Sequence, residues 1–358
     1  MTGQQGLKLG IVGLGHLHPR LYMPLFRQVP SMQVVAVSEK DSSLRDPFCA
    51  EFKVDGYTDL DQMLSSTDLD AAAIFLPHAD CPQAAERCAR AGLHLMVEKP
   101  MASSSAGVAR INRAAAEKNV RLTTGYCWRM HPVAREFKRL IQSGVIGQPV
   151  GAEGRCAAGR LQRYIDGNSA WMLERSRSGG GPMFNLGVHW IDLFRWFFED
   201  EVSEVCGQNV KVNLEYDIED NSFALLRFNR GVIASIDISY TVPDSFPHGR
   251  DLYLSVRGTQ GAVSWAPAYE GEKDVLSVCS DHPDFGGSPR RELAFELESV
   301  AGYSGVMGLE YVRDFADAVL EDRDPAITGQ DGLAALKVVE AIYTAAERRC
   351  WVEVEDAE

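Results

Sequence analysis

The chain has no long apolar run, and this absence bears on whether it is a membrane protein. Its 358 residues contain no stretch of about 18 consecutive apolar residues, so the sequence predicts no membrane-spanning helix and no membrane partner. Residues 1–10 have neither the basic stretch nor the apolar stretch of a secretory signal peptide. We therefore expect a cytoplasmic protein.

The sequence also has no excess of positive charge. Lys and Arg total 36 against 50 Asp and Glu, and the formal net charge at pH 7 is -14. A surface that binds nucleic acid needs clustered positive charge to neutralise phosphates, so we expect no nucleic-acid partner.

No C-x-x-C pair occurs among the eight cysteines, which argues against a structural zinc site. Most of the cysteines lie inside apolar runs, so we predict buried, reduced thiols. The positions are Cys49, Cys81, Cys88, Cys127, Cys156, Cys206, Cys279 and Cys350.

Strands and helices alternate along the first part of the chain. This alternation is typical of a parallel sheet with helices on both faces, and it predicts a doubly wound domain over residues 1–125. The predicted strands are 7–13, 33–38, 70–76, 93–97 and 120–125, and the predicted helices are 19–29, 82–91 and 103–118.

After residue 125 the pattern changes to strands joined by short turns, which predicts an α+β domain over residues 126–358 with a mostly antiparallel sheet. The whole chain is thus expected to be α/β, with two domains that each bury a core. Residues 267–304 are expected to be rich in loops. The predicted strands are 149–158, 203–214, 221–228, 231–240, 250–257 and 261–265, and the predicted helices are 131–143, 182–198, 308–321 and 331–348.

A glycine-rich turn follows the first predicted strand. Gly13 permits a tight turn, and Gly15 lets a pyrophosphate approach the backbone and the N-terminus of the next helix. His18 replaces the third small residue of the usual fingerprint. Glu39, just after the second strand, can accept both ribose hydroxyls and repels a 2′-phosphate, so NAD is favoured; Lys40 beside it keeps NADP possible.

His16 and His18 form an H-x-H pair that invites three interpretations. A metal site is disfavoured because the sequence shows no nearby carboxylate or cysteine to complete it, and we predict no metal. A contact with phosphate or substrate is the second interpretation, and simple packing, above all for His18, is the third.

A helix predicted over residues 182–198 is apolar almost all round, yet it carries a polar stripe. Asn185, His189 and Asp192 fall at i, i+4 and i+7, which places them on one face. Buried polar groups need partners, so the stripe is either a hydrogen-bonded structural cluster or the lining of a substrate cleft. In the second case His189 is a proton acceptor near neutral pH.

Lys99 leaves an apolar strand at its carboxyl end, within Glu98-Lys99-Pro100. Open α/β sheets bind ligands at that edge, where a partly desolvated lysine makes a useful acid or hydrogen-bond donor. The alternative is a surface lysine at a strand end.

Together these motifs make the sequence resemble the glucose-fructose oxidoreductase / inositol dehydrogenase / rhizopine catabolism protein (Gfo/Idh/MocA) oxidoreductase family. The resemblance spans nearly the whole chain, with the motifs in the family's order. They are the Gly13-x-Gly15 turn, Pro77, Ala91–Pro100, Gly125–Pro132, Gly179–Asp192 and Asp324–Gly332.

The resemblance implies that residues 1–125 form a Rossmann-type dinucleotide-binding domain and that residues 126–358 carry a large, open-faced sheet through which dimers or tetramers form. It also implies a catalytic lysine and histidine at Lys99 and His189. The family's aspartate falls on Asn185, which can orient an imidazole but brings no negative charge. Cys81 stands where many members have a histidine near the cofactor. The residues implied to bind the dinucleotide are Gly13, Gly15, His16, Leu17, Glu39, Pro77, Glu98 and Lys99.

The expected activity is oxidation or reduction of a secondary alcohol on a sugar, sugar acid or cyclitol, with hydride moving to or from nicotinamide C4. His189 handles the proton, Lys99 polarises the oxygen and Asn185 orients His189. Two alternatives are an NAD-dependent glycosidase that uses transient redox and a catalytically silent dinucleotide-binding regulator. The candidate substrate-binding residues are Tyr126, Arg129, Trp171 and Asp192.

Overall fold

The computed structural model describes residues 6–269 and 272–355, and its contacts group into two compact units. Residues 1–5, which belong to the segment predicted to carry no signal peptide, and residues 270–271, in the predicted loop-rich region, lie outside the described residues. Unit 1 comprises Met1–Cys127, Tyr164–Gly179 and Val300–Ala334, and unit 2 comprises Trp128–Arg163, Gly180–Ser299 and Ala335–Glu358. The units are therefore not contiguous in sequence, unlike the predicted domains 1–125 and 126–358.

Unit 1 contains a six-stranded parallel sheet in the order β3-β2-β1-β4-β5-β6. Its central strands are buried on both faces because helices cover them, as expected for a parallel sheet. The doubly wound fold predicted from the sequence is confirmed. The strands are β1 Leu7–Val12, β2 Met32–Ser38, β3 Asp55–Tyr57, β4 Ala71–Ile74, β5 His94–Val97 and β6 Leu122–Thr124.

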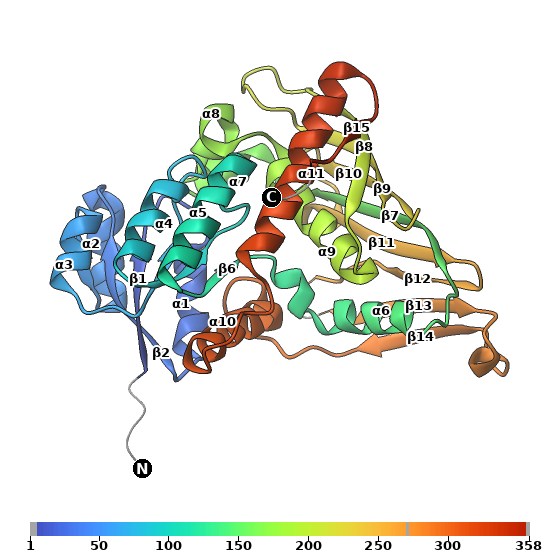
Figure 1. Ribbon diagram of the computed structural model, residues 1–358, viewed down its shortest axis with the longest axis horizontal. Helices are drawn as coiled ribbons and strands as arrows, with labels where there is room; N and C mark the ends of the chain where they lie inside the picture. Colours follow the sequence, from blue (N-terminus) through green and yellow to red (C-terminus); the bar gives the residue numbers. More distant parts are fainter. Residues whose placement is uncertain (1–5, 270–271, 356–358) are drawn as a thin grey trace, which may run out of the picture. The chain divides into compact units, whose positions relative to one another are not determined.

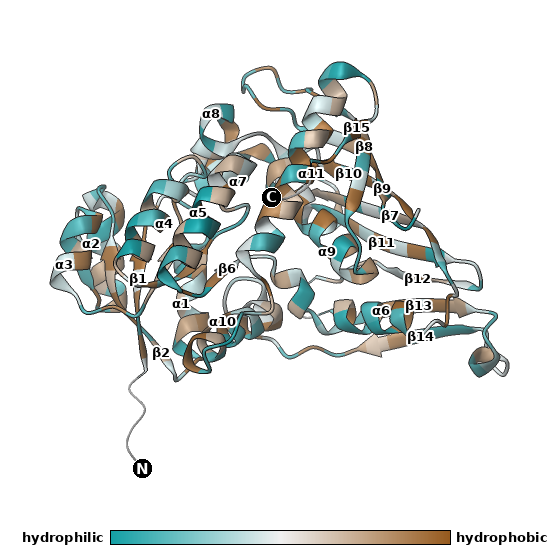
Figure 2. Ribbon diagram, viewed as in Figure 1, coloured by the Kyte–Doolittle hydropathy of each residue, from teal (hydrophilic) through white to brown (hydrophobic). Residues whose placement is uncertain are grey.

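Helices α4 and α5 pack side by side in unit 1, and their visible faces are largely teal in Figure 2, as solvent-facing helix surfaces should be. Helices α2 and α3 were not predicted. In α2 only Phe48 is buried, so its apolar periodicity is too weak to detect. The α-helices with residues in unit 1 are α1 Pro19–Arg27, α2 Ser42–Phe52, α3 Leu60–Ser66, α4 Cys81–Arg90, α5 Ser105–Lys118, α7 Leu161–Asp166, α8 Arg175–Ser178 and α10 Gly305–Leu320.

Unit 2 contains a nine-stranded sheet in the order β14-β13-β12-β11-β7-β10-β9-β8-β15. All its pairs are antiparallel except β7 with β10, so the predicted open, mostly antiparallel sheet is confirmed (Figure 1). The strands are β7 Pro149–Ala158, β8 Val202–Val210, β9 Asn221–Phe228, β10 Ile233–Ser239, β11 Arg250–Gly258, β12 Gly261–Trp265, β13 Asp274–Ser280, β14 Arg290–Phe295 and β15 Val352–Glu353.

The segment 267–304, expected to be rich in loops, also contains two strands that were not predicted, because β13 and β14 pair there at one end of the sheet. Strand β14 begins with Arg290, Arg291 and Glu292, so no apolar run marks it as a strand. The hydrogen bonding of β13 to β12 stabilises these strands, which the strand propensity of their own residues does not predict.

Helices α6 and α9 pack against each other in unit 2, with the rings of Phe137 and Phe197 stacked 4.7 Å apart. Helix α9 lies directly on the sheet: a Cβ at Gly154 of β7 would come within 2.3 Å of Trp190 Cδ1. The indole of Trp190 also donates to the carbonyl of Tyr253 in β11 at 3.1 Å. The longer helices are α6 Pro132–Gln142, α9 Val188–Phe198 and α11 Gly329–Arg348, which begins in unit 1.

Short helical turns complete the two units. Four are 3-10 turns, η1 Cys127–Met130, η2 Ala170–Leu173, η4 Pro247–Gly249 and η5 Pro283–Phe285, and one is a π-helix, η3 Met183–Gly187.

Across the described residues, helices that combine the length and the apolar character needed to span a membrane do not occur. All eight cysteines fall within the described part of the chain and are free thiols. Four are buried, but Cys279 and Cys350 are exposed, so their predicted burial is wrong.

Candidate active site

The turn after β1 has a shape that only glycine allows. Gly13 has φ +88°, and a Cβ there would lie 2.6 Å from Leu76 Cδ2 and 3.0 Å from the carbonyl oxygen of Phe75. At Gly15 the nearest heavy atom to a Cβ would be the carbonyl oxygen of Asn168, at 3.9 Å. The backbone is therefore open to a ligand just before α1 begins.

This turn forms one wall of a pocket of about 810 Å³ within unit 1. Glu39 lies on the same wall, where its carboxylate accepts the backbone N–H groups of Leu14 at 2.7 Å and Asp41 at 2.9 Å. The arrangement suits a dinucleotide, with glycine backbone for the pyrophosphate and a fixed carboxylate for the ribose hydroxyls.

The opposite wall of the pocket comes from residues 164–179, and Trp171 ties it to the glycine turn. The indole Nε1–H donates to the carbonyl of Gly15 at 2.7 Å, and the ring lies edge-on to His78. A second hydrogen bond connects residues 164–179 to the segment after β4, because the Ala79 N–H donates to the Arg177 carbonyl at 3.0 Å. Trp171 was expected to contact substrate, and that stays a prediction. In the structure Trp171 lines the dinucleotide pocket, which its sequence context did not indicate.

A cluster of buried polar side chains follows the glycine turn. His18 Nδ1 lies 3.2 Å from Glu98 Oε2, and His16, His18 and Glu98 bring ligand-type atoms within 4.8 Å of one another. The reasoning that no carboxylate lies near the histidines is thus wrong. His16 Nδ1, however, accepts the His18 N–H at 3.1 Å, so its other nitrogen carries the proton and presents no lone pair to a metal. The absence of a metal stays a prediction.

Burial lowers the pKa of two imidazoles in this region, those of His16 and His78. It lowers the pKa of His16 well below its usual value, and the neighbouring His18 and Lys99 lower it further. Burial likewise lowers the pKa of His78 to about 4, against the hydrogen bond from its Nδ1–H to the Ser178 carbonyl at 2.7 Å.

Pro77 lines the pocket and α4 follows it, beginning at Cys81. Burial raises the pKa of the Cys81 thiol, which donates to the carbonyl oxygens of Leu76 at 3.4 Å and Pro77 at 3.5 Å. A neutral thiol bonded to its own turn cannot replace a histidine as a cofactor ligand.

Lys99 follows β5 and is 2% exposed, so the surface-lysine alternative is wrong. Gly125 leaves room beside it: a Cβ there would lie 3.5 Å from Lys99 Cγ and 3.4 Å from Glu98 Oε1. Tyr126, the next residue, is fully buried.

The helix predicted over residues 182–198 is confirmed as one continuous helical run, but its first part is a π-helix. A π-helix, Met183–Gly187, precedes α9, so the regular i, i+4, i+7 stripe does not extend through Asn185. π-Turns are rare and often mark functional sites. The wider turn directs the Asn185 amide to Tyr240, whose hydroxyl accepts its Nδ2–H at 2.9 Å.

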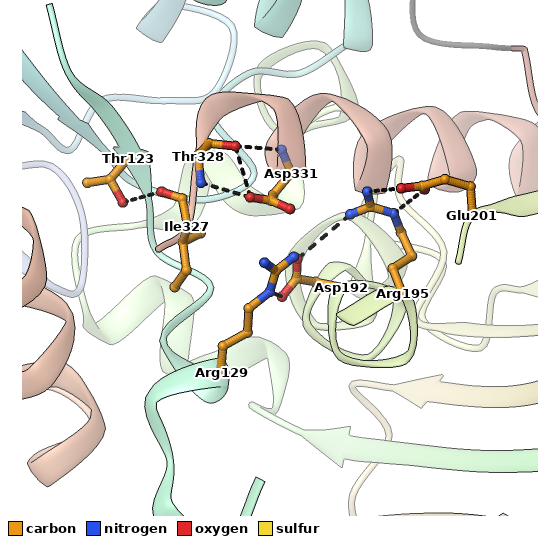
Figure 3. Close-up of polar contacts among 8 residues, drawn as sticks. All are labelled: Thr123, Arg129, Asp192, Arg195, Glu201, Ile327, Thr328 and Asp331. Atoms are coloured by element: carbon orange, nitrogen blue, oxygen red, sulfur yellow. Dashed lines mark hydrogen bonds and ion pairs between the residues drawn. The ribbon is translucent and has the colours of Figure 1, made fainter. Parts of the chain in front are cut away.

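Asp192 on α9 is held by charge pairing (Figure 3). Arg129 donates to the Asp192 carboxylate with two nitrogens, and its Nε lies 2.8 Å from Asp192 Oδ2. Arg195 Nη1 lies 3.9 Å from Asp192 Oδ1. Arg195 in turn makes a two-point contact with Glu201 at 2.6 Å. Arg129 and Asp192 were both expected to bind substrate, and that stays a prediction. Their pairing favours the structural-cluster alternative for Asp192.

The Asp324–Gly332 motif starts helix α11 within unit 1 (Figure 3). Asp331 accepts the N–H and the hydroxyl of Thr328 at 2.8 and 2.9 Å, and Thr123 of β6 donates to the Ile327 carbonyl at 2.8 Å. The motif therefore caps a helix and joins it to the parallel sheet.

Two family models match the chain. One, described as an oxidoreductase family with an NAD-binding Rossmann fold, covers residues 7–126. The other, described as a GFO/IDH/MocA C-terminal domain, covers residues 134–264.

Relatives of known name align over nearly the full chain. Myo-inositol 2-dehydrogenase of Thermotoga maritima is 24% identical over 357 residues, covering 98% of this chain and 99% of that protein. Levoglucosan dehydrogenase of Pseudarthrobacter phenanthrenivorans is 24% identical over 401 residues, covering 98% of each. A solved levoglucosan dehydrogenase in complex with NADH and levoglucosan has the same fold, with a TM-score of 0.84 at 19% identity over 99% of this chain and all of that one.

Trp171→Phe tests the second wall of the pocket. The change keeps the ring but removes the donor to the Gly15 carbonyl, so a bond worth about 1 kcal/mol is lost and NADH should bind roughly fivefold more weakly. Calorimetric titration with NADH measures this. Trp351→Phe, at a partly exposed position in unit 2, is the matched control, and equal affinities for the two variants would contradict the assignment.

Proposed function

The chain belongs to the GFO/IDH/MocA oxidoreductase family, and from this premise we propose that it reversibly oxidises a secondary alcohol of a sugar, sugar acid or cyclitol with a nicotinamide dinucleotide. The observation that carries the proposal is the carboxyl edge of the parallel sheet in unit 1. A glycine turn after β1 and a fixed carboxylate after β2 line the pocket there, and the buried Lys99 follows β5 of the same sheet. The names of the relatives, inositol and levoglucosan dehydrogenases, support the substrate class.

Gly13 and Gly15 bind the pyrophosphate in this proposal, and Glu39 binds the adenosine ribose. His16, Leu17, Pro77, Glu98 and Lys99 complete the dinucleotide site. The bound nicotinamide supplies the acceptor or donor of hydride. Because Glu39 is already fixed by two backbone N–H groups, it meets ribose hydroxyls without reorganisation and repels a 2′-phosphate, which favours NAD over NADP.

The proton of the alcohol goes to His189 in this scheme, and Lys99 donates a hydrogen bond to the reacting oxygen. Lys99 belongs to unit 1 and His189 to unit 2. Both side chains are buried, where a hydrogen bond to developing charge is stronger than in water. Asn185 orients the imidazole but leaves it a weaker base than aspartate would.

We further propose a homo-oligomer, dimer or tetramer, that forms through the sheet of unit 2. A hollow of about 550 Å³ lies over β7–β10, and large apolar side chains around it remain accessible. Phe223 is 43% exposed, and Leu225 and Trp351 are each 39% exposed. Exposed apolar groups gathered on one sheet face are typical of an interface.

Localisation in the cytoplasm is proposed on the state of the cysteines. Eight free thiols, two of them exposed, fit a reducing compartment.

Lys99→Met tests the catalytic assignment. Methionine has a similar length and suits a buried position, so the fold should persist and NADH should bind with only a small loss of affinity, while turnover falls by about a hundredfold to ten-thousandfold. Steady-state NADH formation and NADH titration measure the two effects. Lys118→Met, at an exposed position on α5, is the control, and a Lys99→Met enzyme with undiminished turnover would remove Lys99 from the mechanism.

Glu39→Ala tests the choice of cofactor. The loss of the carboxylate removes its ribose contact and its repulsion of the 2′-phosphate, so the preference for NAD over NADP should shrink at least about tenfold. Dissociation constants for both dinucleotides check this. Glu117→Ala, on the exposed side of α5, serves as the control, and an unaltered preference in Glu39→Ala would refute the argument.

Phe223→Glu tests the oligomer. A charge on this sheet face should dissociate the assembly to monomers, as measured by light scattering after size exclusion. Leu21→Glu, exposed on α1 of unit 1, should leave the mass unchanged. If Phe223→Glu retains the wild-type mass, the interface lies elsewhere.

A further inference from the structure

The glycine turn of unit 1 uses part of its backbone hydrogen bonding within the protein. The Gly13 N–H donates to the Ser38 carbonyl at 2.9 Å, and the Leu14 N–H donates to the Glu39 carboxylate at 2.7 Å. Residues 13–18 contain no Lys or Arg. The turn therefore offers a pyrophosphate the backbone donors that remain, and it adds no lysine or arginine charge.

The side chains that line the pocket of unit 1 are more acidic than basic. Five of them carry carboxylates and three are cations, so an anionic ligand meets repulsion from most of the charged groups around it. A pyrophosphate in this pocket therefore needs one of the three cations as a partner. The carboxylates belong to Glu39, Asp41, Asp59, Asp80 and Glu174, and the cations to Lys40, Arg87 and Arg177.

Two of the three cations are placed for other contacts. Arg87 Nε donates to the Asp61 carboxylate at 2.9 Å. Lys40 directly follows Glu39, the residue proposed to bind the adenosine ribose, so it belongs to the adenosine end of the pocket. Arg177 is the cation that remains for the pyrophosphate.

The backbone of Arg177 is fixed on the wall of the pocket formed by residues 164–179. Its carbonyl accepts the Ala79 N–H at 3.0 Å, after β4. In the same wall, Trp171 Nε1–H donates to the Gly15 carbonyl at 2.7 Å, after β1. These hydrogen bonds connect the wall to two turns at the carboxyl edge of the parallel sheet, where a dinucleotide binds.

The Arg177 side chain makes a weak ion pair. Its Nη1 lies 3.5 Å from Glu174 Oε1, and the two side chains are 43% and 53% exposed. Exposed ion pairs of this kind contribute little to stability, because water screens them. A guanidinium holds a phosphate through two parallel hydrogen bonds, which are stronger. The exchange of Glu174 for a phosphate is therefore favourable.

We propose that Arg177 is a dinucleotide-binding residue, which leaves Glu174 and binds the pyrophosphate from the wall opposite the glycine turn. The turn supplies backbone N–H groups on one side, and the guanidinium supplies positive charge on the other. The inference rests on the proposed function, because a nicotinamide dinucleotide is the ligand that brings a pyrophosphate to this pocket.

A ligand series isolates the contact with the pyrophosphate. NADH fluorescence gives the dissociation constant of NADH directly, and displacement of NADH gives those of ADP and adenosine. Arg177→Gln should weaken the binding of NADH and ADP by about tenfold, because both lose a charge-assisted hydrogen bond, and should leave that of adenosine within about twofold. Equal losses for all three ligands, or an unchanged affinity for ADP, would overturn the proposal.

Arg175→Gln is the matched control. It removes the same charge from an exposed position on the same helix, α8, and Arg175 lies outside the residues that line the pocket. Its affinity for ADP should stay within about twofold of the wild type, and a loss equal to that of Arg177→Gln would reduce the effect to net charge and overturn the contact. Melting temperatures confirm that each variant is folded.

Arg177→Lys separates charge from shape. The ammonium keeps the positive charge but loses the planar fork of the guanidinium, so the affinity for ADP should lie between those of the wild type and Arg177→Gln. An affinity for ADP no higher than that of Arg177→Gln would contradict a charge contact with the pyrophosphate.

Glu174→Gln gives a prediction of opposite sign. The change removes the competing partner of Arg177 and a carboxylate that repels the ligand, so ADP should bind about twofold to fivefold more tightly. In the Arg177→Gln background no guanidinium is released, so the gain should fall below about twofold. Equal gains in the two backgrounds would overturn the exchange of Glu174 for the pyrophosphate.

These binding measurements separate the inference from the proposed function. Variants that bind ADP as expected, in a protein that oxidises no polyol, would uphold the role of Arg177 and reject the proposed function. A protein that oxidises a polyol while Arg177→Gln binds ADP like the wild type would do the reverse. A wild-type protein that binds neither ADP nor NADH would overturn both.

Discussion

A buried pair of opposite charges, Arg129 and Asp192, sets the position of helix α9 in unit 2. The helix is apolar on nearly every side, so apolar contacts alone would tolerate rotation about its axis. Asp192 is 0% exposed, and leaving it without a partner would cost about 3–5 kcal/mol. Only one rotation of α9 about its axis pairs the Asp192 carboxylate with Arg129. Because His189 lies on the same helix, that rotation also sets the direction in which His189 faces. Arg195 and Glu201 extend the same constraint to the end of the helix.

The second constraint on the position of α9 is the close approach of neighbouring groups to the backbone, which glycines allow because they have no side chain. The missing side chain of Gly154 lets Trp190 rest on β7. A Cβ at Gly180 would lie 2.3 Å from the hydroxyl oxygen of Tyr343, and one at Gly181 would lie 2.0 Å from the carbonyl oxygen of Glu219. Gly181 N–H also donates to the Glu219 carboxylate, which holds the residues that lead into the π-helix. The glycine run before α9 therefore sets where the π-turn begins, as well as marking a helix start.

The parts of this account that the sequence predicted depend on local signals. The glycine turn, Glu39 and Lys99 are each defined by a strand and the residues that follow it, so a parallel sheet and its ligand edge could be predicted. What could not be predicted depends on contacts between distant segments. Trp171 reaches the Gly15 carbonyl from 156 residues away, and Glu98 meets His18 only after the sheet has formed. The π-helix leaves no periodic signature, because five residues are too few to show one.

The central claim is that this chain removes hydride from a secondary alcohol carbon of a carbohydrate or cyclitol. The most direct test incubates the protein with NAD⁺ and a panel of sugars, sugar acids and inositols deuterated at their secondary alcohol carbons. NADH absorbance is followed, and the cofactor is then analysed by mass spectrometry. The account predicts that at least one member of the panel yields NADH carrying one deuterium. A protein that binds NAD⁺ yet transfers no deuterium from any member of the panel would contradict it.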